Sequence, residues 1–154
     1  MNSILENPKQ ALSEYVAFPS VSADSNFADG ISGARKFASE RLKELGFKVR
    51  HVETPVNPII LATRGDPSWP RLVIYGHYDV QPPDPLDLWT TKPFEASERN
   101  GRFYGRGAAD NKGPQIVHMC ALYRAIKKNP NLPCLLYTSP SPRDLSTSRM
   151  PSSA

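Results

Sequence analysis

The chain has 154 residues, of which 39% are hydrophobic and 22% charged, and its formal net charge is +4. This length and composition suit one globular domain with a hydrophobic core. The positive charge is spread along the chain, and no run of lysines and arginines alternates with aromatic residues, so the sequence predicts no nucleic-acid groove.

The sequence also gives no sign of a membrane or secretory protein. It contains no stretch of 18 apolar residues, which a spanning helix would need. The first six residues lack the basic segment followed by an apolar stretch that marks a signal peptide. Cys120 and Cys134 have neither a metal-ligand spacing nor a disulfide framework around them. We therefore expect a cytoplasmic protein that binds neither nucleic acid nor a membrane.

The amino-terminal part has the periodicity of two amphipathic helices. From Pro8 to Phe18 apolar residues recur at helical spacing, and a proline suits the first turn of such a helix. Pro19 ends this helix because it cannot donate a backbone hydrogen bond. A second helix is predicted over Ile31–Leu45, with Gly46 as its C-terminal cap.

The middle of the chain alternates strand and turn signals. Phe47–Val52 and Ile59–Thr63 indicate strands, and Leu72–Tyr75 is an unbroken apolar run that is typical of a strand buried on both faces of a parallel sheet. Asn100-Gly101 is a strong hairpin signal between two further short strands. Pro114–Lys128 then has the apolar pattern of a largely buried helix.

Polar residues begin where the Leu72–Tyr75 strand should end. Ligands of open α/β sheets bind outside the carboxyl ends of the strands, which is where His77 and Asp79 would lie. Residues two apart in a strand point to one side, so the Asp79 carboxylate can approach the His77 imidazole. A carboxylate on one ring nitrogen leaves the other free for a metal ion. Taken alone, such a pair is more often an ordinary surface pair.

A second polar centre follows in the glycine-rich loop before the predicted Pro114–Lys128 helix. Asp110 lies in this loop, where glycines allow the backbone to fold tightly around an ion. The alternative for an isolated aspartate before a helix is an N-cap. His51, in one of the predicted strands, is expected to be a surface residue. His118 is expected to be a core or surface residue, because the interior of the following helix is remote from the loop.

Together these motifs resemble the carnosinase-type dipeptidases. They belong to the zinc exopeptidase superfamily, which also contains acetylornithine deacetylase and succinyl-diaminopimelate desuccinylase. The resemblance covers roughly Pro8 to Cys134, and the segments that carry it are Gly76–Pro82, Leu88-Trp89, Pro93-Phe94, Asn100–Gly107 and Asp110–Gly113.

The resemblance implies an α/β fold in which a mostly parallel sheet is flanked by helices. Residues 1–134 would form the amino-terminal part of a zinc-exopeptidase catalytic domain, and the lid domain of the full enzymes would be absent. Residues 135–154 are rich in serine and proline and are expected to be a disordered, non-native tail that looks like translated cloning-adaptor sequence.

The resemblance also implies a site and a chemistry. His77 would bind one zinc ion, Asp110 would bridge two, and Asp79 would orient His77. The peptide bond after the aspartate that matches Asp110 is often cis in the family. The implied reaction is metal-assisted hydrolysis of a dipeptide or short peptide amide by a binuclear zinc site. Lys112 and Arg106 are expected to be loop and surface residues. Imidazole and carboxylate donors leave manganese and cobalt open as alternatives to zinc.

Two hypotheses remain open for this polypeptide. In the family a pair of glutamates follows the next strand, whereas no such pair follows Cys134 here. The chain is therefore expected to be an inactive fragment of an enzyme that acts on small peptides. The alternative is a non-catalytic short protein that binds a partner or a metal without turnover. A full-length relative is expected to be a homodimer, and the oligomeric state of the fragment stays open.

Overall fold

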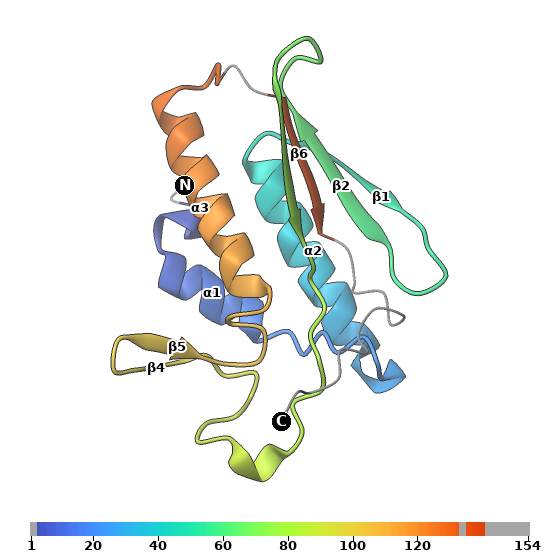
Figure 1. Ribbon diagram of the computed structural model, residues 1–154, viewed down its shortest axis with the longest axis vertical. Coiled ribbons are helices and arrows are strands. Elements are labelled where there is room, and N and C mark those ends of the chain that lie inside the picture. The colour runs from blue at the N-terminus through green and yellow to red at the C-terminus, as the bar shows by residue number, and fades with distance from the viewer. Residues whose placement is uncertain (1–2, 133–134, 141–154) are drawn as a thin grey trace, which may run out of the picture.

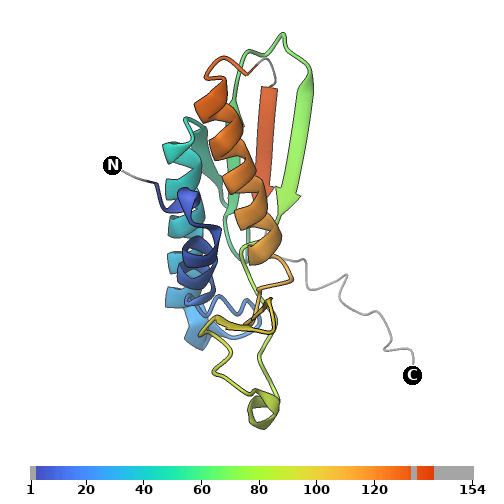
Figure 2. The same ribbon diagram turned by 90° about the vertical axis from the view of Figure 1, so that its left-hand side faces the viewer.

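The computed structural model describes residues 3–132 and 135–140. Its main helices are α1 (Pro8–Val16), α2 (Ala28–Glu44) and α3 (Lys112–Lys128). Figures 1 and 2 show that all three lie on one face of a sheet, whose other face they leave uncovered. No helix among these residues is long and apolar enough to cross a membrane.

The helices begin and end where local sequence signals place them. The Asn7 side chain accepts a hydrogen bond from the Gln10 amide at 3.2 Å, which caps α1. Gly46 has φ of +81° after α2, and the amide of Phe47 donates back to the carbonyl of Leu42 at 3.0 Å. The three predicted helices are therefore confirmed, with α2 and α3 beginning a few residues earlier than the periodicity indicated.

The main sheet is mixed. Its strands are β1 (Lys48–Val52), β2 (Ile59–Arg64), β3 (Arg71–Gly76) and β6 (Leu135–Pro140), in the order β1-β2-β6-β3. Among the described strands only β3 and β6 pair in parallel, because β1 and β2 form a hairpin and β2 runs against β6. The α/β fold class is confirmed, and the described sheet has more antiparallel than parallel pairs.

Strand β6 falls in the segment for which the sequence predicts a disordered tail. Residues 135–140 lie instead between β2 and β3 and pair with both. The prediction of disorder rests on the serine and proline content of this segment. It gives too little weight to Leu135–Tyr137, whose residue types favour a strand and whose backbone pairs with two neighbouring strands. The rest of the expected tail, residues 141–154, lies outside the described residues.

The core lies between the helices and the sheet. Tyr15 of α1 stacks on Phe37 of α2 with 4.7 Å between ring centroids. Other buried members come from the sheet and from α3, among them Ile60, Ala62, Ile116 and Met119.

Strand β3 is less buried than its sequence predicts. The side chains of Val73 and Tyr75 are 66% and 63% exposed. They alternate with Ile74, which packs against the core, so they point to the other face of the sheet, and β3 is the last strand of the described sheet. An apolar run therefore identified the strand correctly but overstated its burial.

A separate hairpin leads to the glycine-rich loop. It consists of β4 (Ser97–Arg99) and β5 (Arg102–Tyr104), which pair antiparallel. Asn100 and Gly101 both have positive φ, of 51° and 72°, as a two-residue type I′ turn requires. The predicted hairpin is confirmed, and it delivers the chain to the loop that holds Asp110 (Figure 1).

Candidate metal site

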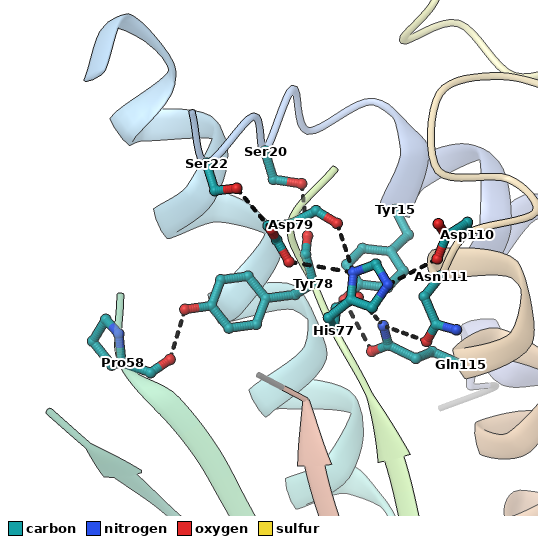
Figure 3. A network of polar contacts seen from close by, with 10 residues as sticks. All are labelled: Tyr15, Ser20, Ser22, Pro58, His77, Tyr78, Asp79, Asp110, Asn111 and Gln115. Atoms are coloured by element: carbon teal, nitrogen blue, oxygen red, sulfur yellow. Dashed lines mark hydrogen bonds and ion pairs between the residues drawn. The ribbon is translucent and has the colours of Figure 1, made fainter. Parts of the chain in front are cut away.

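The polypeptide beyond the end of β3 is fixed by a neighbouring segment, residues 20–22. The Val80 amide donates to the carbonyl of Ser20 at 2.8 Å, and the Ser20 hydroxyl donates to the carbonyl of Tyr78 at 2.7 Å. These bonds hold both sides of Asp79, whose residue exposure is 1%, while His77 is 5% exposed. The carboxyl end of β3 thus presents an imidazole and a carboxylate in a rigid, largely desolvated setting (Figure 3).

His77 and Asp79 contact each other as the His-x-Asp spacing predicts. The imidazole Nδ1 lies 3.2 Å from Asp79 Oδ1 and 3.0 Å from the Asp79 backbone carbonyl. The hydroxyl of Ser22 donates to the other carboxylate oxygen, Oδ2, at 2.7 Å. Nδ1 faces two acceptors, so it is the ring nitrogen that would keep its proton if a cation took the place of the proton on Nε2.

Asp110 approaches His77 from the opposite side. Its Oδ1 lies 2.8 Å from His77 Nε2, and its side chain is 53% exposed. The loop before it is closed by a hydrogen bond from the Lys112 amide to the carbonyl of Gly107, at 2.9 Å. Gly107 has φ of +88°, a conformation that suits glycine, and the Asp110–Asn111 peptide bond is cis. The fold therefore brings all three predicted site residues together, although they come from separate segments.

The two carboxylates change the acidity of the imidazole between them. Burial by itself lowers the pKa of His77, but the hydrogen bonds from the ring to Asp79 and Asp110 outweigh it and raise the pKa above its ordinary value. The surroundings thus favour a positive charge at the ring. A metal cation near Nε2 would be favoured by the same two carboxylates.

The donor atoms fit a divalent cation in part. An imidazole nitrogen and a carboxylate oxygen are ordinary ligands of zinc, and a second carboxylate on the far ring nitrogen is the usual orienting partner. Within residues 3–132 and 135–140, however, no group of three or more histidine, cysteine, aspartate or glutamate side chains could hold a metal ion. The described residues supply two candidate ligands, His77 and Asp110, and one orienting carboxylate, Asp79.

Lys112 is buried, although the sequence predicts a loop or surface residue there. Its ammonium Nζ donates to the carbonyls of Tyr15 and Phe18 at 3.0 and 2.6 Å, at the C-terminal end of α1. Burial lowers the pKa of Lys112 to about 7, against the opposing effect of the nearby Asp79 charge. Its position four residues before the buried Ile116, on the same face of α3, is the sequence signal that could have indicated this burial.

Gln115 is a second buried polar residue that sequence reasoning missed. Its amide oxygen accepts a hydrogen bond from the Tyr15 hydroxyl at 3.2 Å. Its amide nitrogen donates to the backbone carbonyl of His77 and lies 3.4 Å from Asn111 Oδ1. The first turn of α3 therefore contacts the segments that carry both candidate ligands (Figure 3).

The other candidates lie away from this cluster. His118 is exposed on α3, and His51 is exposed on β1 with its Nε2 3.0 Å from the Ser39 hydroxyl. Arg106 is half-buried, and its guanidinium lies over the Trp89 ring at 5.4 Å from the centroid. His51 and His118 are thus surface residues and Arg106 is a loop residue, as the sequence predicts.

Comparison with known proteins shows what the chain around this cluster is similar to. Residues 73–138 match the family described as Peptidase family M20/M25/M40. The chain is 35% identical over 136 residues to the Beta-Ala-His dipeptidase of Rattus norvegicus, covering 78% of this chain and 28% of that enzyme. It is 40% identical over 124 residues to the cysteinylglycine-S-conjugate dipeptidase of Corynebacterium striatum, covering 78% of this chain and 27% of that enzyme.

Solved structures give the same relationship. The crystal structure of human carnosine dipeptidase 1 superimposes with a TM-score of 0.79 at 33% identity, over 90% of this chain and 32% of that one. The family match and the structural comparison show that the chain is similar to peptidases of the M20/M25/M40 family. Within that class it resembles the carnosinase-type dipeptidases, as the sequence motifs predict, and it spans about 28% of the length of the curated relatives it matches.

Proposed function

We propose that this chain carries the first ligands of a binuclear zinc site that hydrolyses dipeptides or short peptide amides. The observation that supports this most is the arrangement of His77 between Asp79 and Asp110, at 3.2 and 2.8 Å, inside the segment that matches the peptidase family. The names of the related dipeptidases supply the substrate class. A small peptide substrate and a cytoplasmic location are part of the proposal.

Each residue has a distinct role in this proposal. Asp79 holds the Nδ1 proton of His77, so that Nε2, which faces Asp110, is the ring nitrogen that would bind the cation. His77 Nε2 and the Asp110 carboxylate are the ligands, and the Ser22 hydroxyl holds the Asp79 carboxylate in place. When bound, zinc would lower the pKa of a water molecule and polarise the scissile carbonyl.

The chain by itself is proposed to be inactive. Catalytic zinc is ordinarily held by three protein ligands, and the described residues offer two near each other. The sequence contains no adjacent pair of glutamates to supply a further ligand and a proton shuttle. In the proposal these groups, the substrate contacts and the contacts of a homodimer belong to the remaining length of a full enzyme.

The second candidate function is a non-catalytic protein that binds a metal or a partner without turnover. It is favoured by the same two-ligand set, which could hold a cation weakly but could not complete a catalytic centre. Measurable metal-dependent hydrolysis by the chain alone would exclude it.

A chimera tests the enzymatic proposal. Residues 1–132 of this chain would replace the matching segment of the Corynebacterium striatum dipeptidase, to which the chain is 40% identical. We expect the chimera to hydrolyse dipeptides, and we expect chelation, His77→Ala and Asp110→Ala each to abolish the activity. His118→Ala, at an exposed histidine of α3, is the matched control and should leave it unchanged. Hydrolysis that survives chelation and His77→Ala would refute the proposal.

A further inference from the structure

The first turn of α3 connects the segment of His77 with the segment of Asp110 through one side chain. This side chain is Gln115, which is 6% exposed and whose amide reaches both segments. On one side its nitrogen donates to the backbone carbonyl of His77, and on the other it lies 3.4 Å from Oδ1 of Asn111, the residue bonded to Asp110. One amide group thus contacts the segment of each candidate ligand.

The orientation of this amide is fixed. The Tyr15 hydroxyl donates to the oxygen Oε1 at 3.2 Å, which leaves the nitrogen Nε2 facing the two acceptors, His77 O and Asn111 Oδ1. Tyr15 itself is fully buried against Phe37. A buried amide with partners on both of its atoms is costly to rotate, since rotation would leave its partners unsatisfied.

The end of β3 is shaped to admit Gln115. A Cβ atom at Gly76 would lie 2.8 Å from Asn111 Oδ1 and 2.9 Å from Gln115 Cγ, closer than real contacts allow. Glycine at this position therefore lets the first turn of α3 abut the residue before His77. The close approach is a second observation, independent of the hydrogen bonds, that couples α3 to the site.

We propose that Gln115 is a positioning residue that sets the mutual orientation of His77 and Asp110. It acts through the backbone of His77 and the side chain of Asn111, and it touches neither the ring nor the carboxylate of the ligands. The inference deepens the proposed metal site and rests on it for its functional meaning. Its structural content, the orientation of the His77 ring, can be measured without any metal.

The test compares two variants by NMR of the histidine rings in the full chain, with chelator present. Gln115→Glu keeps the shape but replaces the donor by an acceptor that faces two oxygens. Met119→Ala, at a buried core residue of the same helix, is the matched control for a general loss of stability. Two-bond ¹H–¹⁵N spectra report the tautomer of each ring.

We expect wild type to show His77 with both ring nitrogens hydrogen-bonded, Nδ1 to Asp79 and Nε2 to Asp110, and Gln115→Glu to show a changed His77 pattern, with His51 and His118 unmoved. Met119→Ala should lower the melting temperature and leave the His77 pattern as in wild type. An unchanged His77 pattern in Gln115→Glu, or an equal change in Met119→Ala, would overturn the proposal.

A kinetic arm separates this inference from the proposed function. In an active chimera, Gln115→Glu should lower kcat about tenfold or more and change KM less than about twofold, because misplaced ligands weaken transition-state stabilisation. A pure rise in KM would count against a positioning role. If the chimera is inactive from the start, the proposed function fails, and the metal-free spectra still decide the role of Gln115.

Discussion

Lys112 makes the stability of the chain depend on pH in a direction that can be calculated. In the folded chain burial lowers the pKa of its ammonium to about 7, whereas in the unfolded chain a lysine titrates near 10.4. Between these values the unfolded state binds more protons, so the free energy of unfolding rises with pH. Replacing Lys112 by methionine keeps most of the side-chain volume and removes the titration.

The magnitude follows from the two pKa values. With about 7 in the folded state and about 10.4 in the unfolded state, Lys112 adds about 2 kcal/mol to the stability between about pH 7.5 and pH 9. The contribution of His77 to the stability changes with pH in the opposite direction. Its pKa is raised in the folded state, so the stability that it adds is lost as pH rises through that value. The difference between wild type and Lys112→Met cancels this term.

Urea unfolding of wild type and Lys112→Met over this pH range, with chelator present, measures that difference. We expect the wild type to gain about 2 kcal/mol relative to the variant. Parallel pH profiles for the two proteins would refute the reasoning. They would mean that the bonds to the Tyr15 and Phe18 carbonyls keep the ammonium charged in the folded state as readily as water does.

Three further predictions concern other parts of the fold. Val73 and Tyr75 expose apolar side chains on the uncovered sheet face, so Val73→Lys with Tyr75→Lys should reduce self-association in light scattering, while unchanged association would show that this face is not responsible. Ser22→Ala removes a hydrogen bond to the buried Asp79 carboxylate and should cost about 1.5–3 kcal/mol in urea unfolding; a neutral result would contradict the role given to that hydroxyl. Gly113→Ala would place a Cβ inside a backbone carbonyl oxygen of the glycine-rich loop and should lower the melting temperature far more than Gly101→Ala, where a Cβ meets no atom within 4 Å and only the positive φ of the turn adds strain.

The sequence predicts the local parts of the structure well. The Gly46 cap, the Asn100-Gly101 turn and the pairing of His77 with Asp79 depend on residues a few positions apart, and each is found. The grouping with Asp110 came from the family resemblance. The structure places Asp110 beside His77, while its role as a ligand stays a prediction.

Features that depend on distant neighbours could not be predicted in the same way. The burial of Lys112 and Gln115 follows from carbonyl and hydroxyl groups of α1, about a hundred residues away in the chain. Val73 is exposed because no layer of the described fold covers that face of the sheet. Residues 135–140 form a strand because they lie between β2 and β3 and pair with both. A sequence pattern records neither the partner of a side chain nor the layer above a strand.

A zinc titration of the full chain, followed by NMR of the histidine rings, tests the central claim most directly. The chain has three histidines, so His51 and His118 serve as internal controls for His77. We predict that zinc first shifts the Nε2 resonance of His77, and that Asp110→Asn weakens this response. Affinity should be low, since two ligands hold the ion. A His77 ring that does not respond while His51 or His118 does would contradict the assignment of the site.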